Sequence, residues 1–162
     1  MSNTNLVLDL TTQRDAILAL YDSLSEAQRT APRTAEDWTI QDMMGHLSFW
    51  EQFTLDCIRD TFKQGRPTPL PPESLTDDLS GQATAQRKDW SWQRIRAEYY
   101  NTHNALIGRI NALSESELQF YVPSPWVNDA RIITLETMVR EDVLGHGQEH
   151  LVEIKEWLDA DR

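Results

Sequence analysis

The sequence predicts an all-α protein that folds as a four-helix bundle. Four stretches carry apolar residues at helical spacing, and none alternates apolar and polar residues as a half-buried strand does. The 162 residues include only 6 glycines and 7 prolines, too few for the many turns of a β-sandwich or barrel. A chain of this length buries a core without disulfides or metals, so we expect residues 1–162 to form a single domain.

The first two helices are predicted from their apolar stripes and their end signals. The first covers about residues 6–24. The second begins after Thr39, which can act as an N-cap together with Asp42 in the manner of a capping box. It continues to about Gln64, ahead of Gly65, with apolar residues along one face.

The third and fourth helices complete the bundle. The third covers about residues 90–113. Large apolar residues recur in it at a strict seven-residue interval, at Trp92, Tyr99, Leu106 and Leu113. The fourth begins at Thr134 and continues to the C-terminus, with an apolar arc about 100° wide. Four amphipathic helices of similar length are typical of a four-helix bundle.

The connections between these helices are unequal in length. Residues 25–38 and 114–133 form medium links, whereas residues 65–89 form a longer one. The long link holds four prolines, from which we expect no helix in it: Pro67, Pro69, Pro71 and Pro72. Extended, the link spans up to about 80 Å, more than the roughly 37 Å of the second helix. It can therefore cross the whole bundle, which predicts parallel second and third helices in an up-down-down-up arrangement.

Charge and cysteine content narrow the expected partners and compartment. The chain has 26 acidic and 15 basic residues, a net charge of -11 that repels phosphate backbones, so we expect no nucleic-acid partner. Cys57 is the only cysteine, which suits a reducing cytoplasm, and we expect it to be a small core residue. No secretory signal and no apolar run of roughly 20 residues is visible, so we expect a cytoplasmic protein without a membrane partner.

The chain has only four histidines, and three of them suggest a metal site. His146 and His150 are four residues apart inside the apolar arc of the fourth helix, so both rings project from one face. Two imidazoles at this spacing can share one ion, each at about 2.0 to 2.1 Å. His46, near the start of the second helix, lies at the same predicted height in the bundle and is the candidate third ligand. The alternative is that the pair are ordinary core or surface histidines.

The fourth histidine, His103, lies at the border of the apolar seam of the third helix. We expect it to be a solvated or hydrogen-bonded side chain rather than a fourth ligand.

Two motifs around the three candidate ligands resemble those of a known family. The segment from Trp38 to Glu51 holds a tryptophan before the second helix and a His-Leu-x-x-Trp-Glu signature that begins at His46. From His146 the chain reads His-x-x-x-His-x-x-x-Ile-x-x-Trp-Leu, ending at Leu158. Together these motifs resemble the DinB/YfiT-like superfamily of metalloenzymes and, within it, most resemble the ClbS/DfsB family.

The resemblance implies a fold, a metal site and a class of chemistry. The family fold is an up-down-down-up four-helix bundle. Its metal-binding members hold a divalent ion, often nickel or zinc, with histidines that match His46, His146 and His150. Some relatives are S-transferases or isomerases that use low-molecular-weight thiols, and the ClbS-like branch protects against an electrophilic genotoxin by hydrolysis. Superfamily members are often homodimers.

Three neutral imidazoles leave a divalent ion at least one open position, as in catalytic sites. Such an ion makes bound water or a thiol nucleophilic near neutral pH. Asp142 and Glu153 lie one turn before and one turn after the histidine pair, where each can orient a ligand ring or act as a general base, or be a solvated carboxylate. The aromatic side chains expected to wall a pocket, or else to pack in the core, are Trp50, Phe53 and Trp126.

The sequence therefore supports two hypotheses. The first is a divalent-metal-dependent enzyme, a thiol S-transferase or a hydrolase, that activates a thiol or water for attack on an electrophilic small molecule. The second is a non-enzymatic helical bundle that binds a metal or ligand, or dimerises, with structural histidines.

Overall fold

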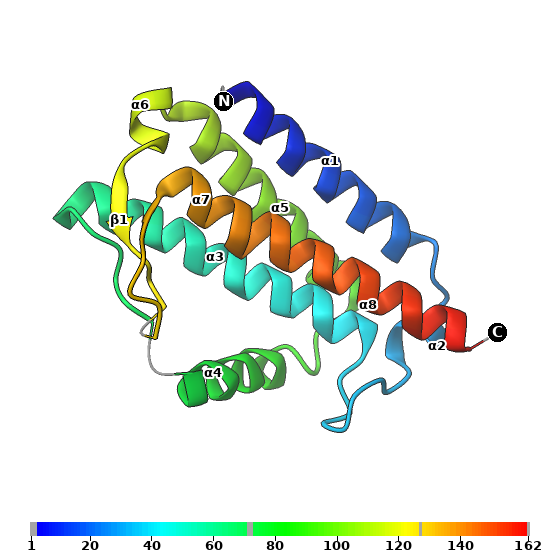
Figure 1. Cartoon of the computed structure of the whole chain (residues 1–162). Helices are drawn as coiled ribbons and strands as arrows, with labels where there is room; N and C mark the ends of the chain where they lie inside the picture. Colours follow the sequence, from blue (N-terminus) through cyan, green and yellow to red (C-terminus); the bar gives the residue numbers. More distant parts are fainter. Residues whose placement is uncertain (1–2, 71–72, 127, 162) are drawn as a thin grey trace.

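The computed structural model describes residues 3–70, 73–126 and 128–161, and it is mostly helical (Figure 1). Four long helical segments make up the body of the molecule. They are α1 (Asn3–Asp22), α3 (Ile40–Gln64), α5 (Trp92–Ala112) and the C-terminal run of α7 (Leu135–Val139), η1 (Arg140–Gly145) and α8 (His146–Ala160). The prediction of the all-α class is confirmed.

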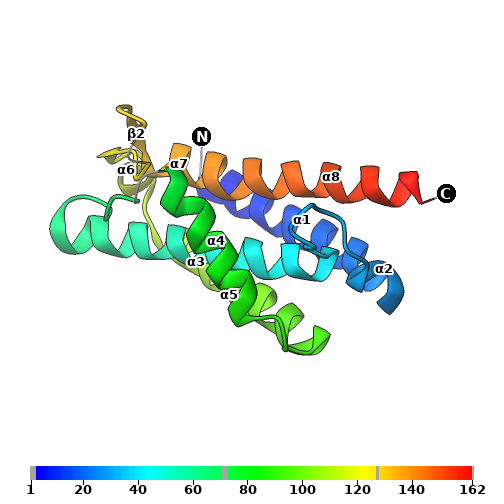
Figure 2. The same ribbon diagram turned by 90° about the horizontal axis from the view of Figure 1, so that it is seen from below.

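Shorter elements lie in the links between the long helices. They are α2 (Glu26–Thr30), α4 (Glu73–Gln86), α6 (Glu115–Leu118), β1 (Tyr121–Pro123) and β2 (Ile132–Thr134). The two strands form an antiparallel pair in which Val122 lies opposite Ile133. Followed by colour in Figures 1 and 2, α1 and α8 run toward one end of the molecule, whereas α3 and α5 run toward the other.

Both ends of α3 follow from local signals in the sequence. The Thr39 hydroxyl accepts the Asp42 backbone N–H, and the Asp42 carboxylate accepts the Thr39 backbone N–H at 2.9 Å, which completes the capping box. Gly65 ends the helix in the left-handed conformation at φ 82°, which a side chain would disfavour. These caps confirm the predicted limits of the helix and hold His46 two turns from its N-terminus.

The long crossover contains a helix, so the prediction of none was wrong. All four of its prolines precede Glu73, where α4 begins; Pro71 and Pro72 lie outside the described residues. Proline disrupts the interior of a helix but not the chain just before it. A proline cluster therefore excludes a helix at its own positions and can also precede the first turn of one. The indole N–H of Trp50 on α3 donates to the Ser80 hydroxyl on α4 at 3.1 Å, which fixes α4 against α3.

The core fills the space between the long helices. Leu6 and Leu10 of α1 pack with Leu106 and Ile110 of α5 and with Val139 of α7, all at most 1% exposed. A second cluster towards the other end of the bundle contains Ile17, Tyr21, Met44, Ile95, Tyr99 and Ile154. The buried Cys57 belongs to the first cluster, as predicted.

Candidate metal centre

Three imidazoles from two helices converge in the bundle. Nε2 of His146 lies 3.0 Å from Nε2 of His46 and 3.0 Å from Nε2 of His150. His46 comes from α3, whereas the other two occupy the first two turns of α8, where their spacing of four residues stacks the rings on one face. Potential ligand atoms of all three residues lie within 4.8 Å of one another. The structure therefore brings together the three histidines that the sequence singled out.

The chemistry of this cluster fits a divalent cation. Burial, reinforced by the neighbouring imidazoles, lowers the pKa of His46 to about 3 and that of His146 to about 4, so both rings are neutral at pH 7. A neutral ring nitrogen has either one proton or one lone pair, so Nε2 of His146 cannot complete a full hydrogen bond with both neighbours. One cation that binds the three Nε2 lone pairs removes this conflict, while Nδ1 of His46 stays buried without a partner among the described residues. Three nitrogen ligands leave a tetrahedral position open.

Neighbouring side chains fix the orientation of the rings. Nδ1–H of His150 donates to Oε2 of Glu153 at 2.8 Å, which turns the Nε2 lone pair of His150 toward the cluster. Trp38 packs edge-on against His46, with ring centroids 5.4 Å apart. Of its two expected roles, Glu153 has the geometry of the orienting group, and it is not among the residues that line the adjoining cavity.

A π-helical segment, η1, leads directly into His146. Nε2 of Gln13 on α1 donates to the Leu144 carbonyl at 2.7 Å, so a side chain from another helix binds the backbone of this segment. The approach is close because position 147 is glycine: a Cβ there would lie 2.7 Å from Oε1 of Gln13. Single-turn π segments occur often at functional sites. Neither η1 nor the role of Gln13 was predicted, and helical periodicity carries no signal for either.

Asp142 on η1 lies at the edge of the cluster. The indole N–H of Trp126 donates to its Oδ1 at 3.0 Å. Burial raises the pKa of Asp142 to about 6, partly opposed by this hydrogen bond. The Trp126 ring also packs on Trp50, with centroids 5.7 Å apart. Trp126, in the loop before β2, therefore both lines the site and binds the Asp142 carboxylate.

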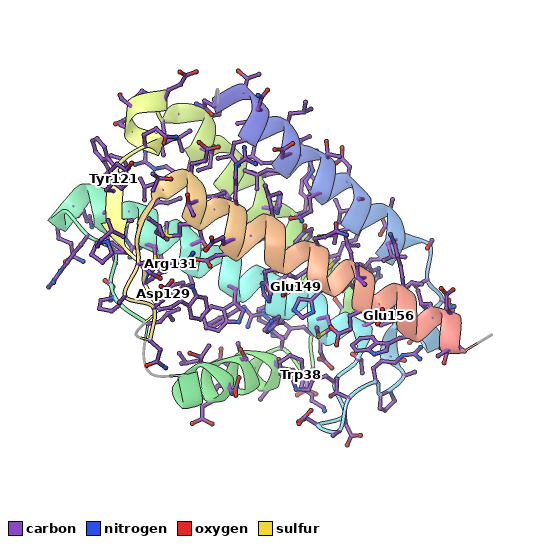
Figure 3. All side chains as sticks on the ribbon, viewed as in Figure 1. Trp38, Tyr121, Asp129, Arg131, Glu149 and Glu156 are labelled. Carbon is purple, nitrogen blue, oxygen red and sulfur yellow. The ribbon has the colours of Figure 1, made fainter. Side chains whose placement is uncertain are left out.

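These groups surround a cavity of about 260 Å³ that lies between α3, α4 and η1. The three predicted pocket aromatics line it together with Asp142, His46 and His146. The other lining residues were not singled out from the sequence: Thr54, Thr76, Asp77, Ser80, Glu141 and Glu149. Thr76, Asp77 and Ser80 belong to α4, which was not expected to be a helix. Figure 3 marks Glu149 on the side of α8 that faces α4.

His103 is not a flank residue and is not solvated. It is fully buried, and its Nε2 lies 2.8 Å from the Leu10 carbonyl, which can only accept a hydrogen bond. Its Nδ1 lies 2.9 Å from Oε1 of Glu51, whose pKa is raised by burial. One proton between these two atoms satisfies both. The hydrogen-bonded alternative was thus the right one, and the polar link joins α1, α3 and α5 inside the core.

Comparison with known proteins decides the family. The family model described as the DinB superfamily matches residues 9–154. The chain belongs to the DinB superfamily. No curated protein matches it.

Solved structures with this DinB fold include two that bear out the ClbS/DfsB-like resemblance. The colibactin self-resistance protein ClbS, in complex with double-stranded DNA, matches with a TM-score of 0.77 at 14% identity, covering 98% of this chain and 96% of its own. DfsB, a sibling lethal factor precursor, matches with a TM-score of 0.80 at 18% identity, covering 100% and 98%. An uncharacterised protein from Clostridium difficile 630 matches with a TM-score of 0.80 at 14% identity, covering 98% and 96%. Identities this low show the shared fold.

The ClbS complex corrects the exclusion of nucleic acid as a partner. That prediction rested on the net charge of -11, yet a protein with this DinB fold was crystallised on double-stranded DNA. Net charge averages over the whole surface, whereas phosphate contacts depend on a local group of basic side chains. Within the described residues, no helix is both long enough and apolar enough to span a membrane.

Proposed function

We propose that this DinB-superfamily chain is a divalent-metal-dependent enzyme that activates water or a low-molecular-weight thiol for attack on an electrophilic small molecule. The observation that carries the proposal is the convergence of three imidazole Nε2 atoms, with neighbouring pairs 3.0 Å apart, beside a cavity of about 260 Å³. Nickel and zinc are the proposed ions, since imidazole ligands suit both. The proposal places this site in one up-down-down-up four-helix domain covering residues 1–162.

The residues around the cluster have distinct proposed roles. His46, His146 and His150 would hold the ion, which when bound supplies positive charge that makes water or a thiol nucleophilic. Oδ2 of Asp142 would accept the proton of the nucleophile, and a pKa of about 6 leaves it ionised at neutral pH. Trp126 holds Oδ1 of the same carboxylate. Trp50, Phe53 and Trp126 would exclude bulk water from the reacting groups.

The decisive experiment measures bound metal and turnover in the same samples. We expect about one nickel or zinc per chain, lost in His146→Ala and His150→Ala while circular dichroism shows that the helices persist. A screen of electrophiles with water alone and with different cellular thiols then identifies the nucleophile. Glu156→Gln, outside the cavity lining on α8, is the matched control. Absence of metal after loading would contradict the proposal, and bound metal without any turnover would favour the non-enzymatic metal-binding bundle.

Two further parts of the proposal concern assembly and location. We propose a homodimer in the cytoplasm, on the strength of the family resemblance and of the single, buried cysteine. Light scattering at several protein concentrations tests the dimer, and fractionation of the native host tests the location.

Binding of double-stranded DNA is a second candidate function. The ClbS complex suggests it, and this chain has a shallow groove between α3 and α5 whose lining includes Lys63 and Arg109. Arg59 also lines the groove but is paired with Asp56 at 2.7 Å. Phosphate contacts there would be weakened by salt. A titration of labelled duplex DNA at 50 and 300 mM salt tests this, with Lys63→Ala and Arg109→Ala expected to weaken binding. If a variant with both substitutions binds DNA as tightly as the native protein, the groove is not the DNA-binding site.

A further inference from the structure

The cavity beside the histidines has a strongly one-sided charge. Among the described residues that line it, four carry carboxylates, Asp77, Glu141, Asp142 and Glu149, and none is a lysine or arginine. Only Glu141 has a cationic partner within the described structure, Arg131, at 2.8 Å. Arg131 also pairs with Asp129 at 2.8 Å. Figure 3 labels both residues on the loop that leads to β2. Three of these carboxylates therefore lack a cationic side-chain partner; Asp77, Glu141 and Glu149 are solvent-exposed, and a divalent ion on the histidines would offset part of the negative charge.

Aromatic rings form another part of the wall. The Trp50 ring packs against those of Trp126 and Phe53, with its centroid 5.7 Å from each. The face of an indole or phenyl ring carries partial negative charge and attracts cations, most strongly in a site shielded from water. Where a ring presents its face to the cavity, it favours the same kind of ligand as the carboxylates do, by an independent interaction.

Two of the described lining residues also have a buried polar atom without a hydrogen-bond partner, Nδ1 of His46 and Oγ1 of Thr76. Oγ1 of Thr76 on α4 is shielded from solvent and has no hydrogen-bond partner among the described residues. A buried hydroxyl without a partner is costly, so a small shift of α4 that opens this oxygen to a ligand N–H group in the cavity would be favoured. This third feature lies on α4, whereas the carboxylates come mainly from η1 and α8 and the aromatics from α3 and the loop.

We propose that the cavity selects a small electrophilic substrate carrying a positive charge, such as an ammonium group, and disfavours anionic molecules. This rests on the proposed function and deepens it by naming the substrate class. The histidine side of the cavity would take the nucleophile, while Asp77, Glu149 and the aromatic faces receive the charged part of the substrate. Thiols that carry carboxylates are then disfavoured as cosubstrates, relative to water or uncharged thiols, because the same walls repel them.

Binding of three matched probes to the metal-loaded protein tests the charge preference. Benzyltrimethylammonium, benzyl alcohol and benzenesulfonate share a phenyl ring and differ in charge. By calorimetric titration we expect the cation to bind about tenfold more tightly than the alcohol, and the sulfonate most weakly. Equal affinities, or tightest binding of the sulfonate, would overturn the proposal.

Variants locate the preference within the cavity. Asp77→Asn combined with Glu149→Gln removes two charges without removing volume, and we expect the cation-to-alcohol affinity ratio to fall by about threefold while the alcohol binds as before. Glu156→Gln removes a charge from α8 outside the cavity lining and is expected to leave the ratio unchanged. A ratio unaffected by the double substitution would contradict the assignment of these residues.

Failure of the charge preference can be distinguished from failure of the proposed function. Metal content and turnover are measured in each sample, and the three probes are titrated again into His146→Ala. If this variant lacks metal yet keeps the preference for the cation, the charge selection stands by itself. If the native protein binds metal and turns over electrophiles without regard to charge, the proposed function stands and the charge selection fails.

Discussion

Asp142 illustrates how one residue links the site to stability. Its pKa is about 6 in the folded protein against an ordinary 3.8, because burial penalises the charged form. The folded state therefore holds this proton more tightly than the unfolded state does. The resulting stabilisation is fully present below about pH 4 and is lost as the pH rises through about 6.

Asp142→Asn should consequently stabilise the metal-free protein at alkaline pH. Asparagine has no charge to bury and keeps an oxygen to accept the Trp126 indole N–H. We expect the free energy of unfolding to rise by about 2 to 3 kcal/mol at pH 8 and to be unchanged at pH 4, with turnover strongly reduced. Urea unfolding of both proteins at the two pH values measures this. A gain of equal size at pH 4 would show that charge burial is not its cause.

Glu153 orients the His150 ring, because its Oε2 accepts the Nδ1–H of His150 at 2.8 Å. Glu153→Ala removes the acceptor that orients the ring, and we expect metal affinity to fall about tenfold. Glu153→Gln retains an acceptor oxygen and is expected to lose less. Competition with a coloured chelator gives both affinities, and a larger loss in the glutamine variant would contradict the orienting role.

At the scale of elements, local signals determined where helices start and stop, and tertiary contacts determined the rest. Thr39 with Asp42 and the left-handed Gly65 act within a few residues, so the limits of α3 were predictable. The prolines of the crossover were taken only to exclude a helix from residues 65–89, so α4 was not predicted. The π segment is bound by Gln13 of α1, a contact between helices that no local pattern reports.

Substitutions at Gln13 and Gly147 measure how much this contact between helices stabilises the protein. Gly147→Ala would place a Cβ 2.7 Å from Oε1 of Gln13 and displace the amide that binds the Leu144 carbonyl. We expect a loss of about 1 to 3 kcal/mol in stability for Gly147→Ala in the native background and clearly less in a Gln13→Ala background. Chemical unfolding of the four proteins gives the coupling energy. Additive effects would contradict a direct clash.

At the scale of the whole molecule, the site joins two helices that are far apart in the sequence, so ion binding should stabilise the fold. A ligand that binds only the folded state adds about 2.7 kcal/mol at a free concentration one hundred times its Kd. We expect the melting temperature to rise with added nickel or zinc, to fall with a chelator, and to lose this response in His150→Ala. A melting temperature independent of metal would contradict a site that spans α3 and α8.

The sequence by itself determined the helical class, the limits of α3 and the three histidines that converge, because periodicity, caps and i,i+4 spacing are encoded within single helices. Only the tertiary structure decided that His103 pairs with Glu51 in the core, that Gln13 reaches the π segment, and that acidic and aromatic side chains share one cavity. These features arise where side chains from different helices meet. Their distances depend on how the helices pack, which the spacing along any one of them does not specify.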